Sequence, residues 1–201
     1  MTNLFFFGTL CDVPLLQIVL GRDSAPVDGL LSAPDNDLHM TPARLPDHVV
    51  TWVRDQPFPM MSAAPGGMAE GLLVSGLDDG DQQRLDFYEG GFDYDRASVT
   101  VETDQGPVEA QVYLPKSGRW TAGAPWSLGD WQAEWGALTR HAAQEVMAHF
   151  GRLSAGEMRF ARPQIMARAA SWVRARNHLR PLNFGTDLGV QHTEMAARRR
   201  P

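Results

Sequence analysis

The chain has 201 residues, an apolar fraction of 43% and a net charge of −6, so one domain with an appendage and a real hydrophobic core is expected. The acidic balance argues against nucleic acid as the main partner, because nucleic-acid-binding domains usually present a basic surface. No apolar run reaches the roughly 18 residues that a membrane span needs, and no basic region precedes the first apolar run as in a signal peptide. The single cysteine, Cys11, excludes an internal disulfide, and together these features favour the cytoplasm.

The N-terminal segment predicts a buried strand that leads at once into a helix. Leu4–Phe7 is a short aromatic run that ends at a glycine, a pattern typical of a buried strand. The apolar residues of Val13–Leu20 share one helical face, with Asp12 placed as an N-cap and Gly21 as a stop. The turn between them, Gly8–Leu10, either only redirects the chain or holds a ligand.

The middle of the chain predicts many short strands separated by proline and glycine. The expected strands are Val27–Ser32, Leu38–Met40, His48–Arg54, Glu70–Gly76, Ala97–Thr103 and Val108–Leu114. Between them Asp78–Tyr88 predicts a short helix, because acidic residues occupy its first turn. This order of elements predicts an α+β protein with a curled sheet or a small barrel.

The C-terminal part predicts two helices. The first opens at Ser127 and carries apolar residues at helical spacing as far as Phe150, so Trp131 and Trp135 are expected to be buried against the barrel. The second opens at the capping-box pattern Ser154–Glu157. Pro163 is expected to interrupt or restart this second helix.

The end of the chain is basic although the whole chain is acidic. From Arg152 onward there are ten arginines and only three acidic residues, and Gln164–Leu179 is arginine-rich and amphipathic. Such an asymmetry leaves three alternatives, namely packing on the acidic part, docking on a partner, or remaining partly loose. Residues 181–201 show no periodicity and are expected to form a mobile tail, with Arg198–Arg200 exposed.

Glu89 is the first candidate for chemistry. It closes the predicted acidic helix, and aromatic residues surround it in the sequence at Phe87, Tyr88, Phe92 and Tyr94. A carboxylate that aromatic side chains partly desolvate has a raised pKa and can act as a general base near neutral pH. The plainer alternative is a solvated acid at a helix end with Gly90 as the C-cap, and the pattern of residues alone favours it.

The order and spacing of the motifs in this chain favour the catalytic interpretation of Glu89 over the solvated one. They resemble those of the gamma-glutamylcyclotransferase-like superfamily, also called AIG2-like. An apolar strand that ends in Gly8-Thr9-Leu10 is followed about 80 residues later by LDFYEG, which contains Glu89, and then by Tyr94-x-Arg96. Three further segments resemble the family's proline-containing segment, its strand before the acidic helix and its closing strand; these are Phe58–Met60 with Gly66-Gly67, Glu70–Leu77, and Glu109–Leu114. The resemblance covers about residues 3 to 115.

The resemblance implies a small mixed β-barrel with packed helices, and here a C-terminal helical extension. The implied organisation is a gamma-glutamylcyclotransferase-like domain over 1–125, a helical extension over 126–180 and the tail over 181–201. It also implies a small-molecule γ-glutamyl substrate and no metal or cofactor. Gly8, Thr9 and Leu10 would hold the substrate's α-carboxylate. Glu89 would take a proton from the α-amine, which attacks the γ-carbonyl of the same molecule and releases 5-oxoproline and an amine.

Three further residues are assigned to the cavity, and one of them, Phe7, departs from the family pattern. Many members carry tyrosine where this chain has Phe7, so the site has one hydroxyl fewer. Tyr94 and Tyr113 are assigned to the cavity wall, although both also fit ordinary strand positions.

Two questions about function therefore stay open at this stage. The cavity either catalyses the reaction or only binds a small ligand, with the basic end recruiting a partner. The helix Gln164–Leu179 resembles the linker of AIG2-like proteins fused to a Nudix hydrolase, but no Nudix box follows it. This helix either covers the barrel as an extension, or forms a contact with a protein partner or a second copy of the chain.

Overall fold

A computed structural model describes residues 2–22, 38–90, 92, 94–116, 118 and 120–178, with backbone only for 177 and 178. The expected strand Val27–Ser32 and the expected tail, including Arg198–Arg200, lie outside the described residues.

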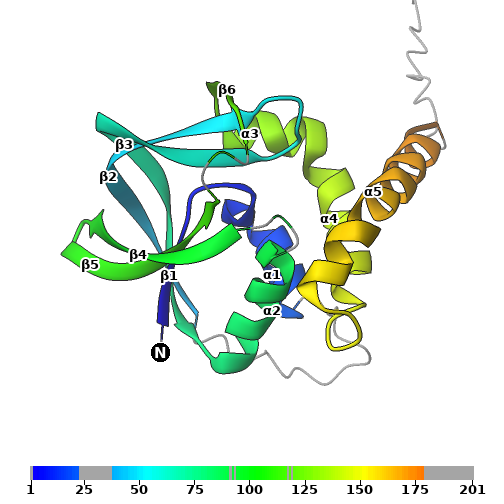
Figure 1. Ribbon diagram of the computed structural model, residues 1–201, viewed down its shortest axis with the longest axis horizontal. Coiled ribbons are helices and arrows are strands. Elements are labelled where there is room, and N and C mark those ends of the chain that lie inside the picture. Colours follow the sequence, from blue (N-terminus) through cyan, green and yellow to red (C-terminus); the bar gives the residue numbers. More distant parts are fainter. Residues whose placement is uncertain are drawn as a thin grey trace, which may run out of the picture.

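The strands form one mixed sheet that closes on itself, as Figure 1 shows. They are β1 (Thr2–Phe6), β2 (His39–Val53), β3 (Pro59–Leu77), β4 (Tyr94–Thr103), β5 (Gly106–Pro115) and β6 (Ala122–Pro125). Their order is β3-β1-β5-β4-β2-β6, and because β3 also pairs with β2, strands β1 to β5 close into a barrel. The β1–β5 pair is parallel and the other pairs are antiparallel. The predicted α+β class with a small mixed barrel is therefore confirmed.

Strands β2 and β3 are much longer than the sequence predicts. Pro42 and Pro46 lie inside β2, and Pro65–Gly67 lies inside β3, so the expectation that these residues separate short strands is wrong. The β2–β3 pairing shifts register at a bulge between Pro46 and His48 and then continues. Asp47 in this bulge has a φ of 57°, and Gly66 on the opposite strand has a φ of 78°. The Asp47 carboxylate accepts the Gly66 N–H at 2.8 Å, so the two strands bend together and remain paired. The short strand β6 was also not predicted, because its sequence AGAP carries no strand signal.

The first helices agree with the local signals in the sequence. After the 3₁₀ turn η1 (Thr9–Cys11), α1 covers Val13–Leu20, capped by Asp12, whose Oδ1 accepts the Leu15 N–H at 3.0 Å. It ends at Gly21, which has a left-handed φ of 71°. Helix α2 covers Asp79–Gly90 with acidic residues in its first turn.

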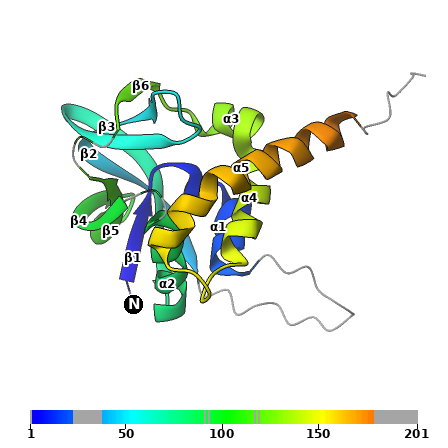
Figure 2. The same cartoon turned by 45° about the vertical axis from the view of Figure 1, so that its right-hand side comes forward.

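The C-terminal helices lie on one side of the barrel, and α5 passes over α2 and α4 in Figure 2. Helix α3 (Leu128–Trp131), a π-helical turn η2 (Gln132–Gly136) and α4 (Ala137–Met147) follow one another without a break, and α5 covers Ala155–His178. Trp131 is fully buried, as expected, whereas Trp135 is half-buried. Within the part of the chain that the structure describes, no helix is both long and apolar enough to cross a membrane.

Pro163 does not interrupt α5, so that expectation is wrong. The capping box is confirmed, because the Ser154 N–H donates to Glu157 and the Glu157 N–H donates to the Ser154 hydroxyl. Apolar residues on both sides of the proline, Met158 and Ile165, are fully buried against the rest of the protein. Their burial compensates for the backbone hydrogen bond that the proline removes.

Strand β1 is buried on both faces, and this fixes the start of the Gly8–Leu10 turn. Leu4 and Phe6 belong to the core between the barrel and the helices, whereas Phe5 and Phe7 belong to the core formed by residues from β1 to β5. This alternation follows from the two-residue period of a strand.

Candidate active site

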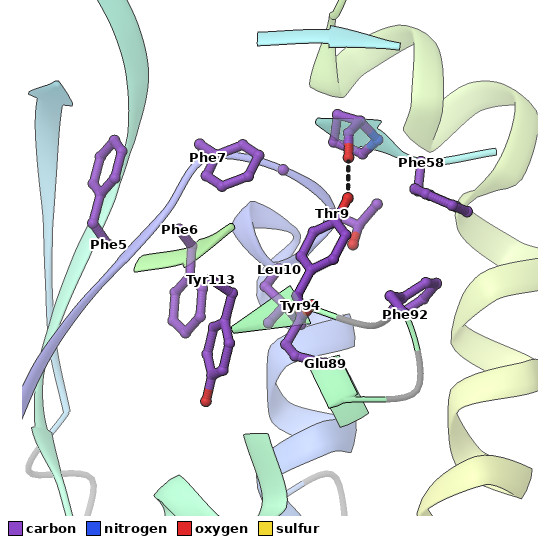
Figure 3. A pocket seen from close by; sticks show the side chains of 12 residues that line it. Phe5, Phe6, Phe7, Thr9, Leu10, Phe58, Glu89, Phe92, Tyr94 and Tyr113 are labelled. Carbon is purple, nitrogen blue, oxygen red and sulfur yellow. Dashed lines mark hydrogen bonds between the residues drawn. The ribbon is translucent and has the colours of Figure 1, made fainter. Parts of the chain in front are cut away.

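The Gly8–Leu10 turn and Glu89 lie in one cavity, between the end of β1 and the last turn of α2 (Figure 3). The cavity has a volume of about 440 Å³, counting its open mouth. All the site residues named from the sequence line it, namely Phe7, Gly8, Thr9, Leu10, Glu89, Tyr94 and Tyr113. The rest of its wall is apolar and is formed by Phe5, Phe6, Phe58, Pro59 and Phe92. Of these, Phe58-Pro59 was noted in the sequence only as a motif, without a place in the site.

Close packing explains why the first strand ends at a glycine. A Cβ added to Gly8 would lie 2.6 Å from Cγ of Pro59, at the start of β3. Real Cβ atoms do not approach other atoms so closely, so only glycine lets β3 close over the turn. The turn then forms its own hydrogen bonds, from the Cys11 N–H to the Gly8 carbonyl and from the Asp12 N–H to the Thr9 carbonyl, both at 3.0 Å.

Asp12 joins this turn to the C-terminal helices. Its side chain is fully buried, and it accepts hydrogen bonds from Nε of Arg140 and from Nε2 of Gln132, each at 2.8 Å. Burial alone would raise the pKa of Asp12, but the hydrogen bonds from Arg140, Gln132 and the Leu15 N–H hold it below its ordinary value. The sequence identified Asp12 as a helix cap, but nothing in it indicated the two partners more than a hundred residues away.

Glu89 is buried, with 8% of its surface exposed. The interpretation of Glu89 as a solvated helix-end acid is therefore wrong. Burial raises its pKa to about 7, and the positive charge of Arg162 opposes that rise. The acid and its conjugate base are thus both populated near neutral pH, which is the condition for a group that first takes and then returns a proton.

The two cavity tyrosines are held by hydrogen bonds within the protein. The Tyr94 hydroxyl donates to the Pro59 carbonyl oxygen at 3.0 Å, as Figure 3 shows. The Tyr113 hydroxyl donates to Oδ1 of Asp86 at 2.8 Å, and Asp86 also accepts a hydrogen bond from Arg96, the arginine of the Tyr-x-Arg motif. Burial raises the pKa of both phenols, the Asp86 carboxylate raises that of Tyr113 further, and the Glu89 charge adds to the rise for both. Both hydroxyls therefore stay protonated, and their rings give the wall its shape.

Arg162 of α5 is a residue near the site that sequence reasoning missed. Its Nη2 donates to the carbonyl oxygen of Tyr88 at 2.8 Å, and its guanidinium carbon lies 3.9 Å from the ring centroid of Phe92. Phe92 in turn donates its backbone N–H to the Glu89 carbonyl oxygen at 2.8 Å. The sequence marked the helix as arginine-rich, but it offered no signal that distinguishes this arginine from the others.

Comparison with known proteins places the chain in a family. A family model described as "Gamma-glutamyl cyclotransferase, AIG2-like" matches residues 4–133, which is more than half of the chain. The protein belongs to the gamma-glutamyl cyclotransferase, AIG2-like family. The matched segment contains the Gly8–Leu10 turn and Glu89, whereas Arg140 and Arg162 lie beyond its end.

Solved structures similar to this AIG2-like protein are distant in sequence. One described as gamma-glutamyl cyclotransferase is 14% identical over 81% of this chain and 98% of its own, with a TM-score of 0.49. A protein from Arabidopsis thaliana, solved in solution, is 16% identical over 97% of this chain and 95% of its own, with a TM-score of 0.48. An AIG2-like protein from Mus musculus is 15% identical over 63% of this chain and 88% of its own, with a TM-score of 0.38. A search of curated proteins finds no match.

The polar groups that line the site are a carboxyl group, hydroxyls and backbone amides. In the described ranges, His, Cys, Asp and Glu side chains nowhere form a group of three or more that could hold a metal ion. Cys11, which follows the turn, donates its thiol hydrogen to the Phe6 carbonyl oxygen at 3.1 Å, and burial raises its pKa to about 12. The thiol is therefore protonated at neutral pH and is a packing residue beside the cavity.

Proposed function

We propose that this protein is a gamma-glutamylcyclotransferase that releases 5-oxoproline from a γ-glutamyl amine, amide or peptide. The single observation that carries the proposal is the buried Glu89 carboxyl in the same cavity as the Gly8–Leu10 turn, where burial raises its pKa to about 7. A carboxyl group with this pKa accepts and returns protons readily at neutral pH. Membership of the family adds support that is independent of the pKa.

The reaction needs positioning and proton transfer. The neutral α-amine of the γ-glutamyl group attacks the γ-carbonyl carbon of the same molecule, which forms the lactam ring and places negative charge on the carbonyl oxygen. The Glu89 carboxylate takes the proton that the attacking nitrogen must lose. When the bond between that carbon and the leaving nitrogen breaks, the protonated Glu89 gives the same proton to the leaving nitrogen. Since the nucleophile belongs to the substrate, a cavity that holds the chain folded supplies much of the acceleration.

The turn is the proposed anchor for the substrate's α-carboxylate. Backbone N–H groups that converge in a turn favour an anion, and Gly8, Thr9 and Leu10 line the cavity together. The Thr9 hydroxyl adds a further donor. Anchored there, the α-carboxylate holds the neighbouring α-amine on the side of the cavity where Glu89 lies.

A second candidate function is binding without turnover, and Phe7 is the observation that favours it. The side chain of Phe7 is buried among the barrel core residues and brings no hydroxyl to the cavity. The wall is otherwise mostly aromatic. A cavity with fewer donors stabilises a developing negative charge less well.

Replacing Glu89 by glutamine separates the two functions. Glu89→Gln keeps the volume of the side chain but cannot take a proton, so we expect release of 5-oxoproline from a panel of γ-glutamyl compounds to fall by about 10²–10⁴-fold. The matched control is Glu102→Gln, which changes an exposed glutamate of β4 and should leave the rate within about twofold. Wild-type turnover by Glu89→Gln would overturn the mechanism. Calorimetric binding of γ-glutamyl compounds to a wild-type protein that turns none of them over would establish the binding function instead.

A further inference from the structure

A second cavity lies directly beside the first, between the barrel and helices α4 and α5. Its volume is about 1160 Å³, counting the space open to solvent. Thr9, Phe58 and Phe92 line both cavities. Figure 3 shows Phe58 and Phe92 on the side of the first cavity that faces the C-terminal helices. The two aromatic rings lie 5.1 Å apart, edge to face, and form the wall that the cavities share.

The lining of the second cavity is mostly apolar, it includes the neutral polar residues Thr9, Gln56 and Thr139, and its charged side chains are all positive. Helix α4 contributes Ala142, Ala143 and Val146, and α5 contributes Met166. Two arginines of α5, Arg159 and Arg162, also line it. Among the described residues around this cavity there is no aspartate or glutamate. Its walls therefore favour an apolar group, and its charge favours an anion over a cation.

The proposed reaction in the first cavity determines which part of the substrate extends toward the second cavity. Glu89 returns its proton to the leaving nitrogen, so that nitrogen must lie within hydrogen-bond reach of the carboxyl. The first cavity is small, and the γ-glutamyl half of the substrate occupies it. Any group attached to the leaving nitrogen must therefore extend out of the first cavity, and the shared wall of Phe58 and Phe92 borders the adjacent space.

Arg162 supplies the charge at the junction. Burial lowers its pKa, and the interactions with Tyr88 and Glu89 that raise it do not offset this effect, so its charge is not fully compensated. Its Nη2 donates to a neutral carbonyl, that of Tyr88, and its Nε is buried without a hydrogen-bond partner among the described residues. A carboxylate in the second cavity would compensate this charge.

We propose that the second cavity binds the leaving half of the substrate and selects γ-glutamyl peptides whose second residue is a large apolar amino acid. The apolar side chain occupies the space along α4, and the α-carboxylate of the leaving amino acid lies toward Arg162 and Arg159. Leaving groups that carry an ammonium group are disfavoured, either alone, as in a polyamine, or beside a carboxylate, as in a lysine joined through its ε-amine. This inference rests on the proposed function, and the residues of α4 and α5 on which it depends lie outside the segment that the family model matches.

A substrate panel tests the size and charge of the leaving group separately. The panel is γ-glutamyl-phenylalanine, γ-glutamyl-glycine, γ-glutamyl-phenethylamine, which lacks the carboxylate, and ε-(γ-glutamyl)-lysine. We expect kcat/KM for the phenylalanine compound to exceed that for the glycine compound by at least about tenfold, because each buried methylene group contributes to discrimination. The phenethylamine compound should lie below the phenylalanine compound, and the lysine compound below both. An active enzyme that prefers glycine or the lysine compound overturns the subsite proposal and leaves the proposed function intact.

Two variants test the lining directly. Arg159→Glu should raise KM for γ-glutamyl-phenylalanine by about fivefold relative to its effect on γ-glutamyl-phenethylamine, since Arg159 is exposed and its charge is partly screened. The matched control is Arg174→Glu, the same change at an exposed arginine of α5 that does not line the cavity. Thr139→Phe fills the cavity from α4, and the buried Thr139 hydroxyl has no hydrogen-bond partner among the residues that the structure describes. This variant should lower the ratio of kcat/KM for the phenylalanine compound over the glycine compound by about tenfold. If thermal melting shows that the variant is folded and this kcat/KM ratio is unchanged, the proposal is contradicted.

Binding to Glu89→Gln keeps the test independent of catalysis. If the wild type turns over none of the panel, the proposed function fails, and calorimetry on Glu89→Gln still measures the second cavity. Tighter binding of γ-glutamyl-phenylalanine than of γ-glutamyl-glycine, by about tenfold or more, supports the subsite. Equal affinities overturn it.

Discussion

Arg162 donates a hydrogen bond of 2.8 Å to the carbonyl oxygen of Tyr88, the residue that immediately precedes Glu89. This contact brings a positive charge from α5 to the buried carboxyl of α2. The charge opposes the rise in pKa that burial imposes on Glu89. Because Arg162 lies beyond the segment that the family model matches, the C-terminal helix of this protein adjusts the proposed catalytic group from outside that segment.

Removing the charge of Arg162 should therefore raise the pKa of Glu89 further above 7. We predict that Arg162→Met moves the acid limb of the pH dependence of kcat to higher pH, because kcat reports groups of the substrate complex. The limb belongs to Glu89 and the substrate amine together, so the direction of its shift is the informative quantity. The control is Arg174→Met, and thermal melts exclude unfolding. An acid limb that stays at the wild-type pH would contradict a role of Arg162 in setting the pKa.

The buried carboxyl of Glu89 should also make stability depend on pH. The folded-state pKa of about 7 lies above the ordinary value of 4.5, so the folded protein binds the proton more tightly than the unfolded chain does. The contribution of Glu89 to stability is then complete below pH 4.5, is lost as the pH rises toward 7 and changes little above that. Glu89→Gln has no titrating group at this position. The free energy of unfolding of the variant minus that of the wild type should therefore increase by about 3 kcal/mol between pH 4.5 and pH 8.

Urea denaturation at several pH values measures this difference directly. Comparing the two proteins at each pH removes the contribution of the other titrating groups, which they share. Glu102→Gln, at an exposed position, should show a flat difference from the wild type over the same range. A flat difference for Glu89→Gln as well would mean that the carboxyl is solvated in solution.

Local signals predicted local structure well. Asp12 and Gly21 bound α1 at the residues where the sequence places them, because a cap and a left-handed glycine act within one turn. The prolines in β2 and α5 predict breaks that do not occur, because pairing with β3 and the burial of Met158 and Ile165 outweigh the loss of local hydrogen bonds. The turn and Glu89 were identified through the resemblance to a family. Arg140 and Arg162 could not be identified, because their roles depend on how α4 and α5 pack on the barrel.

Gly8 is expected to tolerate no side chain. In Gly8→Ala the new Cβ would lie 2.6 Å from Pro59, so the turn and β3 must move apart. We predict a loss of about 1–3 kcal/mol of stability together with a fall in turnover, because the turn is the proposed carboxylate anchor. Gly129→Ala is the control, since its new Cβ would be 3.8 Å from the nearest atom and alanine favours the helix there. Chemical denaturation and rates with one γ-glutamyl substrate measure both effects, and a fully active Gly8→Ala would show that the turn is not under this constraint.

The ion pair between Asp12 and Arg140 is expected to hold the turn in place from the far end of the sequence. Asp12 is fully buried, so removing its cationic partner leaves a buried carboxylate with only the Gln132 and Leu15 donors. Breaking a buried pair from one side is strongly destabilising, and we predict a loss of about 3 kcal/mol for Arg140→Met. Because the loss depends on the charge of Asp12, it should shrink as the pH falls and the unpaired carboxyl takes up a proton.

A second arginine pair offers a matched control for this last prediction. Arg168 of α5 pairs with Glu145 of α4 at the surface, where both side chains are partly exposed. Arg168→Met should therefore cost no more than about 1 kcal/mol. Equal losses for the two variants in urea denaturation would mean that the Asp12 pair contributes no more than a surface pair. A large loss confined to Arg140→Met, accompanied by weaker binding of γ-glutamyl compounds, would establish that α4 stabilises the Gly8–Leu10 turn through Asp12.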